Sequence, residues 1–510
     1  MNRLGSLLER HPDRVAVIAG ERRLAFAELA ERAARVAGGL REAGLRRGDV
    51  LALWLPNRPE WLELLFACAR LGVCVAAVNT RYRAAELEHV LRASRARGIV
   101  LAPGFLGVDF RGLLDRVRPS LPDLEFVWSP ETVPLGPPAA DGGRPDDRCA
   151  LFATSGTTSG PKLAAHRQGP VERHAREVAR AFDLRPGERS LLALPLCGVF
   201  GFNTALGALA GGAACVLQEV FDPDRAARLM CAQGIEHLTG SDAMLRAVLD
   251  SPELDPARLR WRRGAFANFA GLVAELVRDA ETRAGVRLTG VYGMSEVFAL
   301  MATWDPDDPP ETRVLSGGRP VCPDIEVRAC DPATGRPCPH GRPGELQIRG
   351  YNVTEGYLHN PEATRAAFTG DGWFRTGDLG YTRPDGGFVF LARLRDSLRL
   401  RGFLVDPAEI EEELARHPAV RAAQVVGVER PGEGEVPVAF VLAGDDFDEG
   451  RVLEFVRGRL AGYKVPRRVV PVDEFPTTQG PNGVKVQKVR LRELAARALE
   501  DPRREGGAGG

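Results

Sequence analysis

Residues 154–162 place hydroxyl groups, glycines and one ammonium in a single short run. The run reads T-S-G-T-T-S-G-P-K and follows an apolar, strand-like stretch. Glycine lets backbone N–H groups crowd around phosphate oxygens, and hydroxyl and ammonium groups add charge-assisted hydrogen bonds. A P-loop is excluded, because Pro161 interrupts its glycine–lysine pair and Leu163 stands where that motif needs serine or threonine. We therefore predict a phosphate-binding loop of another kind, with a plain surface loop as the alternative. Its candidate ligands are Thr154, Ser155, Gly156, Thr157, Thr158 and Lys162.

A second run, V-Y-G-M-S-E at residues 291–296, could also serve a nucleotide. Tyr292 offers an aromatic face to a base, Gly293 permits close backbone approach, and Ser295 can donate to a phosphate. Glu296 supplies a hard carboxylate oxygen, and Mg²⁺ usually takes one or two carboxylates together with phosphates. Taken alone, the run favours a helix N-cap followed by an acid, and the nucleotide role is favoured only together with the 154–162 loop.

A third run, R-T-G-D-L at residues 375–379, carries a single carboxylate. One carboxylate can accept two hydrogen bonds at once, so Asp378 suits a vicinal diol. A β-turn is the structural alternative for T-G-D.

In their order along the chain, these runs resemble those of the adenylate-forming (ANL) superfamily, which includes AMP-dependent acyl-CoA synthetases and ligases, nonribosomal-peptide adenylation domains and luciferases. In that family the first run reads TSGTTG-x-PKG, so Ser159 and Leu163 are departures that leave every hydroxyl and Lys162 in place. The second run resembles YG-x-[ST]-E. Residues 344–368 are close to the family's pattern for the strands below the site, which implies a structural role for them.

The resemblance implies a role for each candidate residue. Ser295 and the 154–162 loop would bind the phosphates of ATP, and Glu296 would act in catalysis as the Mg²⁺ ligand. Asp378 would bind both ribose hydroxyls, and Arg393 would reach the ribose as well. The adenine-side loop G-A-F-A-N-F keeps only Ala267 of the usual G-G-A pattern. The implied adenosine ligands are Ala267, Tyr292, Gly293, Asp378 and Arg393.

The resemblance also implies a moving C-terminal domain. Arg395 falls on the family's hinge, where aspartate or lysine is common. Residues 482–492 match G-K-x-x-[KR]-x-x-L-R with one inserted residue, which makes Lys485 the catalytic lysine; a solvated basic strand end is the alternative. A carboxylic acid is already ionised at neutral pH, so the first half-reaction needs no general base and depends on cations aimed at the developing charge. The product would be an acyl-adenylate, and rotation about Arg395 would then let a thiol attack it.

The acyl pocket is expected near residues 195–203, P-L-C-G-V-F-G-F-N, with Gly198, Phe200 and Phe202 as its candidate lining. Adenylation domains for amino acids usually carry an aspartate in this neighbourhood, and none stands between Leu191 and Ala214. A largely apolar lining favours a fatty or aryl carboxylate as the small-molecule substrate.

The acceptor is expected to be coenzyme A, because no insertion of the kind that marks fatty-acyl-AMP ligases stands between Glu296 and Asp378. The nearest alternative is a stand-alone adenylation enzyme that loads the phosphopantetheine of an acyl carrier protein. The third hypothesis is a degenerate synthetase that has lost catalysis and acts as a nucleotide- or acyl-binding regulator. The implied catalytic lysine and ribose-binding aspartate are both present, as Lys485 and Asp378, which argues against this hypothesis.

Composition narrows the class of protein further. The chain has 68 basic and 68 acidic side chains, and a net charge of zero argues against a nucleic-acid partner. No apolar run of about 18 residues and no signal-peptide pattern occurs, so we expect no membrane span. Nine scattered cysteines without a C-x-x-C pair suit reduced thiols and a cytoplasmic protein. The oligomeric state does not follow from the sequence.

Lysine is scarce, with four among the 68 basic residues. Arginine replaces lysine on most solvated surfaces, but not where a compact ammonium of adaptable geometry is needed. Two of the four, Lys162 and Lys485, fall on the positions where the implied mechanism needs an ammonium.

Alternating helices and strands must position these groups. Helical patterns at 26–43 and 60–71 alternate with apolar runs at 50–55 and 73–78, which indicates α/β layering with a largely parallel sheet. Short β-runs between turns follow residue 310, and a small α+β unit with helices at 407–417 and 449–460 begins after residue 396. We therefore predict an α/β fold: a large N-terminal α/β domain with layered sheets and a β-rich subdomain, plus a smaller, mobile C-terminal α+β domain.

The predicted boundaries are residues 1–394 for the adenylation domain that binds ATP and the acyl substrate, and 395–500 for the mobile domain with the catalytic lysine. Residues 501–510 are predicted to form a disordered tail.

Overall fold

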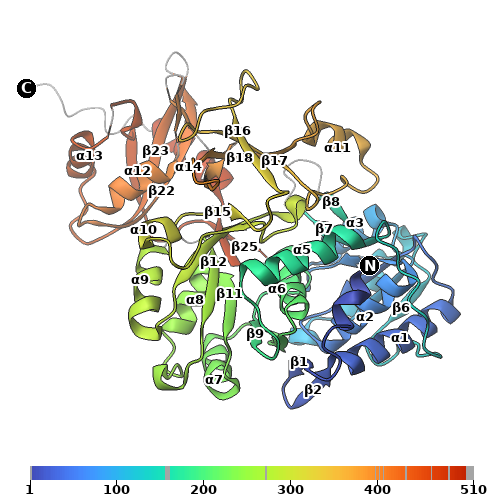
Figure 1. Ribbon diagram of the computed structural model, residues 1–510. Helices are drawn as coiled ribbons and strands as arrows, with labels where there is room; N and C mark the ends of the chain where they lie inside the picture. Colours follow the sequence, from blue (N-terminus) through green and yellow to red (C-terminus); the bar gives the residue numbers. More distant parts are fainter. Residues whose placement is uncertain are drawn as a thin grey trace, which may run out of the picture. The chain divides into compact units, whose positions relative to one another are not determined.

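The computed structural model (Figure 1) describes residues 3–154, 161–269, 273–394, 396, 398–400, 403–405, 407–430, 434–460, 462–480 and 483–500. For residues 399, 403–404, 478–480 and 483–485 this description covers the backbone alone. The chain divides into two compact units: Met1–Glu326 with Ile348–Phe374, and Val327–Gln347 with Arg375–Gly510. Among the described residues, no helix is long and apolar enough to cross a membrane.

The first sheet of unit 1 has the strand order β6-β5-β3-β4-β7-β8 and is parallel except for its last pair. Strands β3, β4 and β5 are buried along their whole length, which is typical of a sheet covered on both faces. The strands are β3 (Val50–Trp54), β4 (Cys74–Ala77), β5 (Gly98–Leu101), β6 (Phe126–Trp128), β7 (Arg148–Ala153) and β8 (Leu163–Arg167).

The helices beside this sheet begin and end where local sequence signals lie. In α1, Glu28 accepts a hydrogen bond from the backbone N–H of Ala25 at 2.8 Å, and Gly44 ends the helix with a φ of 110°. The predicted helices at 26–43 and 60–71 are confirmed as α1 and α2. The bounds are α1 (Phe26–Ala43), α2 (Pro59–Leu71), α3 (Ala84–Ser94) and α4 (Phe110–Val117).

The second sheet of unit 1 runs in the order β15-β14-β13-β12-β11-β9-β10-β1-β2. The strands from β13 through β1 are parallel to one another, and antiparallel pairs follow at both ends. The bounds are β1 (Val15–Ala19), β2 (Arg22–Ala25), β9 (Arg189–Leu192), β10 (Ala214–Leu217), β11 (His237–Ser241), β12 (Arg263–Ala267), β13 (Leu288–Tyr292), β14 (Ala302–Thr303) and β15 (Gly317–Pro320).

Helices α5 (Gln168–Ala181) and α6 (Val199–Ala210) pack on each other and lie in the middle of unit 1 (Figure 1). The largest apolar core cluster joins them to α1, α2 and strands of both sheets. The other helices of unit 1 are α7 (Pro223–Gln233), α8 (Asp242–Leu249), α9 (Val273–Ala284), α10 (Pro310–Arg313) and α11 (Pro361–Ala367).

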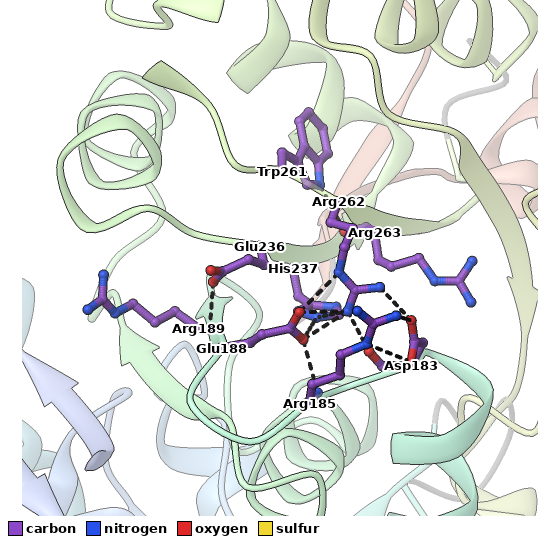
Figure 2. Close-up of polar contacts among 9 residues, drawn as sticks. All are labelled: Asp183, Arg185, Glu188, Arg189, Glu236, His237, Trp261, Arg262 and Arg263. Atoms are coloured by element: carbon purple, nitrogen blue, oxygen red, sulfur yellow. Dashed lines mark hydrogen bonds and ion pairs between the residues drawn. The ribbon is translucent and has the colours of Figure 1, made fainter. Parts of the chain in front are cut away.

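A charged network holds the amino-terminal ends of β9, β11 and β12 together (Figure 2). Glu188 accepts from Arg262 at 2.8 Å and lies 2.8 Å from Nε2 of His237, while Arg262 also bonds Asp183 at 2.6 Å. Burial raises the pKa of Glu188, but hydrogen bonds from His237 and Arg262 outweigh it and bring the pKa to about 2. The network fixes the amino-terminal ends of these strands, whereas the predicted nucleotide residues lie at the carboxyl ends.

Unit 2 contains β19 (Phe388–Arg393) and most of β16 (Glu326–Cys330), β17 (Gly344–Arg349) and β18 (Phe374–Thr382). A three-stranded sheet in the order β22-β23-β24 follows, with separate strand pairs β20–β21 and β25–β26. The bounds are β20 (Leu398–Leu400), β21 (Phe403–Val405), β22 (Val420–Arg430), β23 (Gly434–Ala443), β24 (Arg468–Val472), β25 (Thr477–Gly480), β26 (Gly483–Val486), α12 (Pro407–Ala415), α13 (Glu449–Arg457) and α14 (Lys488–Glu500).

Candidate active site

The two ends of the predicted phosphate loop are joined by backbone hydrogen bonding. Strands β7 and β8 pair with Ala153 opposite Leu163, and the N–H of Thr154 donates to the carbonyl of Lys162 at 2.8 Å. The carbonyl of Pro161 accepts from Nε2 of His89, on α3, at 2.7 Å. The structure therefore holds the base of the loop firmly. The predicted ligands Ser155, Gly156, Thr157 and Thr158 lie outside the described residues.

Tyr357 connects two predicted site residues, Lys162 and Glu296. Nζ of Lys162 lies 4.9 Å from the centroid of the Tyr357 ring, a cation–π contact. The Tyr357 hydroxyl donates to Oε1 of Glu296 at 2.9 Å, and Glu296 is buried. Burial, together with the Glu296 carboxylate, raises the pKa of Tyr357, so its hydroxyl remains a donor.

The turn before Tyr357 ties Glu296 to the strand that follows the phosphate loop. The N–H of Thr354 donates to the carbonyl of Glu296 at 2.7 Å, and its hydroxyl donates to the carbonyl of Ala165 at 2.8 Å. Sequence reasoning gave residues 344–368 only a structural role, so it missed Thr354 and Tyr357. The available signal was the position of these two residues within a stretch that already resembled the family.

Ala267 and Tyr292 stand at the carboxyl ends of β12 and β13, which are parallel neighbours. In open α/β sheets, ligands bind in the crevice outside the carboxyl ends of the strands. Gly293 follows Tyr292 directly, and Ser295 begins a short 3₁₀ turn whose first carbonyl accepts from Nε2 of His166 at 2.8 Å. The structure therefore brings Ala267, Tyr292, Gly293, Ser295 and Glu296 to one end of the sheet.

The candidate acyl-pocket residues lie at the start of α6. Gly198 is the N-cap residue, and Phe200 and Phe202 are buried. The centroid of the Phe202 ring lies 5.1 Å from that of Phe152 and 5.8 Å from that of Phe298. The start of α6 is thus an apolar, aromatic wall.

In unit 2 the predicted ribose ligands Asp378 and Arg393 form an ion pair of 2.8 Å between Oδ1 and Nη1. They are direct register partners on β18 and β19, and Asp378 is 2 % exposed. The hydroxyl of Thr376 accepts from the N–H of Asp378 at 3.0 Å and donates to the carbonyl of Leu346 at 2.7 Å. These contacts fix the carboxylate within the strand pair.

The remaining predicted residues of unit 2 are described only in part. Arg395 lies outside the described residues, while its neighbour Asp396 pairs with Arg492 at 2.8 Å. Lys485 stands on β26 opposite Thr478, and its side chain lies outside the described residues. Of the other lysines, Lys464 bonds Glu409 and Lys488 bonds Glu411, both in unit 2.

Two family matches cover most of the chain. The model described as "AMP-binding enzyme" matches residues 6–358, and that described as "AMP-binding enzyme C-terminal domain" matches residues 409–480. The chain belongs to the AMP-binding enzyme family, whose members form adenylates, and the predicted family is confirmed. Within it, this chain is an AMP-forming acid–thiol ligase of the acyl-CoA synthetase group.

Individual relatives align with this chain along almost their whole length. Feruloyl-CoA synthase of Amycolatopsis sp. is 34 % identical over 94 % of this chain and 96 % of its own. The 2-succinylbenzoate–CoA ligase of Geobacillus kaustophilus is 35 % identical over 95 % of each chain. The ATP-bound structure of MatB from Rhodopseudomonas palustris superposes with a TM-score of 0.85 at 28 % identity, over 97 % of this chain and 99 % of its own. The predicted fold class is confirmed.

Proposed function

We propose that this enzyme activates a fatty or aryl carboxylic acid with Mg²⁺-ATP and transfers the acyl group to coenzyme A. The observation that carries the proposal is the Lys162–Tyr357–Glu296 arrangement in unit 1. It sets one ammonium and one buried carboxylate around a single aromatic ring, at the strand ends where nucleotides bind in such folds. The ammonium can bind phosphate oxygens, and the carboxylate can bind the magnesium ion that accompanies them.

Glu296 fits a magnesium ion better than a metal held by the protein alone. Mg²⁺ keeps several waters and takes one or two carboxylates together with substrate phosphates. Among the described residues, no group of three or more His, Cys, Asp or Glu side chains could enclose a metal ion. When bound, Mg²⁺ would reduce the charge on the phosphates. Glu296 would hold the ion, with its carboxylate oriented by Tyr357.

The protein's part in the first half-reaction is to position charges. Lys162 and Ser295 would bind phosphate oxygens, Tyr292 would stack on the base, and Asp378 would accept from both ribose hydroxyls. Lys485 would hold the substrate carboxylate against the α-phosphate, whose like charges repel it. The carboxylate oxygen then forms a bond to phosphorus, pyrophosphate leaves, and the acyl-adenylate remains for a thiolate to attack.

An aryl acid is the first substrate class to test. Two of the similar proteins are named for feruloyl and 2-succinylbenzoate, and a third similar structure is titled an anthranilate CoA ligase. The buried rings of Phe200 and Phe202 offer an apolar wall at the predicted pocket. That wall suits an aromatic or aliphatic acid better than a charged amino acid.

The domain division at residues 394 and 395, with a hinge at Arg395, is part of the same proposal. The C-terminal family match begins at residue 409, which supports a separate domain after the hinge.

ATP–pyrophosphate exchange with a panel of fatty and aryl acids tests the first half-reaction. Thioester formation with coenzyme A, or with a phosphopantetheinylated acyl carrier protein, then tests the acceptor. We expect exchange with at least one acid and product with coenzyme A. No exchange with any acid would contradict the proposal, and product with the carrier protein alone would replace coenzyme A by the carrier.

A further inference from the structure

The chain takes an unusual path directly after Glu296. Phe298, Ala299 and Leu300 have φ angles of 62°, 42° and 43°. Residues with a side chain adopt this left-handed conformation at a cost in free energy, and normally as single residues. Three in succession, without a glycine or asparagine, need support from the rest of the fold.

That support is a set of donors to five consecutive backbone carbonyls, those of residues 295–299. A turn of this kind cannot satisfy its carbonyls internally, so each one needs an outside partner. His166 donates to Ser295 at 2.8 Å, and the N–H of Thr354 donates to Glu296 at 2.7 Å. The side chain of Asn352 donates to the carbonyl of Val297 at 2.7 Å.

Two further donors hold the left-handed residues themselves. Nδ2 of Asn203, on α6, donates to the carbonyl of Phe298 and lies 3.4 Å from that of Ala299. Nε2 of His174, on α5, donates to the carbonyl of Ala299 at 2.9 Å. Both side chains are completely buried.

The hydrogen bonds determine the tautomer of His174. A carbonyl only accepts, so Nε2 carries the hydrogen and Nδ1 is the acceptor. Nδ1 lies 3.2 Å from the hydroxyl of Tyr351, which therefore donates to it. The Phe298 ring packs edge-on against His174, with centroids 5.6 Å apart. His174 is thus oriented from both sides.

The left-handed turn is coupled directly to the nucleotide residues. The N–H of Ala299 donates to the carbonyl of Met294 at 3.0 Å, and the N–H of Met301 donates to that of Tyr292 at 3.1 Å. A Cβ atom on Gly293 would lie 2.5 Å from Cα of Ala299. Only a glycine fits there, so the position of Ala299 sets the position of residues 292–296.

We propose that His174 and Asn203 are positioning residues for adenylation: they hold the left-handed turn 298–300 and thereby fix Tyr292, Ser295 and Glu296 for Mg²⁺-ATP. This inference rests on the proposed function. Pre-positioned charges need no rearrangement during the reaction, and small misplacements of such groups cost large factors in rate. The residues act through the backbone and touch no reacting atom.

His174→Gln and His174→Asn form a matched pair of polar variants. The amide nitrogen of glutamine can reach the place of Nε2, whereas that of asparagine corresponds to Nδ1 and falls short of Ala299. We expect the asparagine variant to lose about 10- to 100-fold in kcat/KM for ATP in pyrophosphate exchange. We expect the glutamine variant to retain most of the wild-type rate. Asn203→Leu, which removes the second donor, should lower exchange as His174→Asn does.

Two further measurements separate positioning from general damage. In His174→Asn, thioester formation from a supplied acyl-adenylate should fall less than pyrophosphate exchange. The base contact of Tyr292 would serve both steps, whereas the magnesium site at Glu296 would serve adenylation alone. His237→Asn is the control, since His237 is also buried but lies in the charged network of Figure 2. It should lower both half-reactions equally or neither.

Hydrogen–deuterium exchange gives a readout that does not depend on activity. In His174→Asn, the amides of Ala299 and Met301 should exchange faster than in the wild type, while those of β9 and β11 should not. Equal loss of both half-reactions, equal rates for the glutamine and asparagine variants, or unchanged amide exchange would overturn the inference. A wild-type enzyme without pyrophosphate exchange would instead contradict the proposed function.

Discussion

The hydroxyl of Tyr357 donates to the carboxylate of Glu296 at 2.9 Å, and the same ring carries the ammonium of Lys162 on its face. One aromatic side chain thus sets the distance between the proposed metal ligand and a proposed phosphate ligand. Because Glu296 is buried, its charge needs a hydrogen-bond donor in the absence of a metal ion.

Tyr357→Phe should weaken the use of Mg²⁺-ATP while the ring contact with Lys162 is kept. A hydrogen bond to a charged acceptor contributes about 1.5–3 kcal/mol, so kcat/KM for ATP should fall about 10- to 100-fold. Pyrophosphate exchange as a function of Mg²⁺ and ATP concentration measures this. Tyr357→Leu removes the ring as well and should fall further. A phenylalanine variant with wild-type kinetics would show that the hydroxyl has no part in the site.

Asp378 should decide whether the enzyme distinguishes ATP from its 2′-deoxy analogue. The wild type should prefer ATP by about 10- to 100-fold in pyrophosphate exchange, since a buried carboxylate that loses one hydrogen-bond donor loses about 1.5–3 kcal/mol. In Asp378→Ala the preference should disappear, mainly because the rate with ATP falls. The side chain of Arg393 is 39 % exposed, so water can solvate it when its partner is removed.

Glu345→Gln is the matched control for that experiment. Glu345 is a second buried acid of unit 2 and pairs with Arg375 at 3.0 Å. Its variant should leave the preference for ATP unchanged. If Glu345→Gln removed the preference and Asp378→Ala retained it, the ribose role of Asp378 would be wrong.

Lysine should not be replaceable by arginine at the two proposed catalytic ammonium positions. Lys485→Ala and Lys485→Arg should each lower adenylation at least about 100-fold, because the guanidinium has a different size and a fixed planar geometry. Thioester formation from a supplied acyl-adenylate should stay largely intact in both. Lys162→Arg should also lower adenylation.

Lys464→Arg provides the control for the lysine series. Lys464 bonds both carboxylate oxygens of Glu409 at 2.5 and 2.7 Å, an arrangement that arginine can reproduce. Its variant should have wild-type activity in both half-reactions. Equal loss of adenylation and thioester formation in Lys485→Ala would contradict the role given to that residue.

Contiguous sequence signals predicted a large part of the fold and several site residues. The helix at 26–43 follows from apolar periodicity and a terminal glycine, both local features. Asp378 and Arg393 were each found within a short motif, and the structure pairs them across β18 and β19. Their predicted roles toward the ribose, like those of Gly198 and Arg395, remain predictions.

The rest depends on contacts between distant positions. Tyr357 follows Glu296 by 61 residues, and His174 precedes Ala299 by 125, so no window of sequence contains either pair. The left-handed turn at Phe298–Leu300 has no glycine, asparagine or aspartate to indicate it. Buried donors from α5 and α6 impose it, which is a tertiary effect that local propensity does not predict.

The buried histidines should make unit 1 sensitive to mild acid. Burial lowers the pKa of His166 and of His174 from 6.5 to about 4. Between pH 6.5 and 4 the unfolded chain therefore binds protons that the folded protein does not, so stability falls as the pH falls through this range. Each histidine contributes at most about 3 kcal/mol to the change. The pKa of Glu188 is about 2 in the folded protein and 4.5 in the unfolded chain, so its contribution to stability is lost only below about pH 4.5.

Urea unfolding followed by tryptophan fluorescence checks this, because all six tryptophans lie in unit 1. The free energy of unfolding should fall from pH 7.5 to pH 5 in the wild type. In His174→Gln the fall should be smaller, since glutamine keeps the donor to Ala299 but does not titrate. Lys464→Arg leaves both buried histidines in place, so this variant should retain the wild-type slope. Identical slopes in the wild type and His174→Gln would show that His174 does not take up a proton on unfolding.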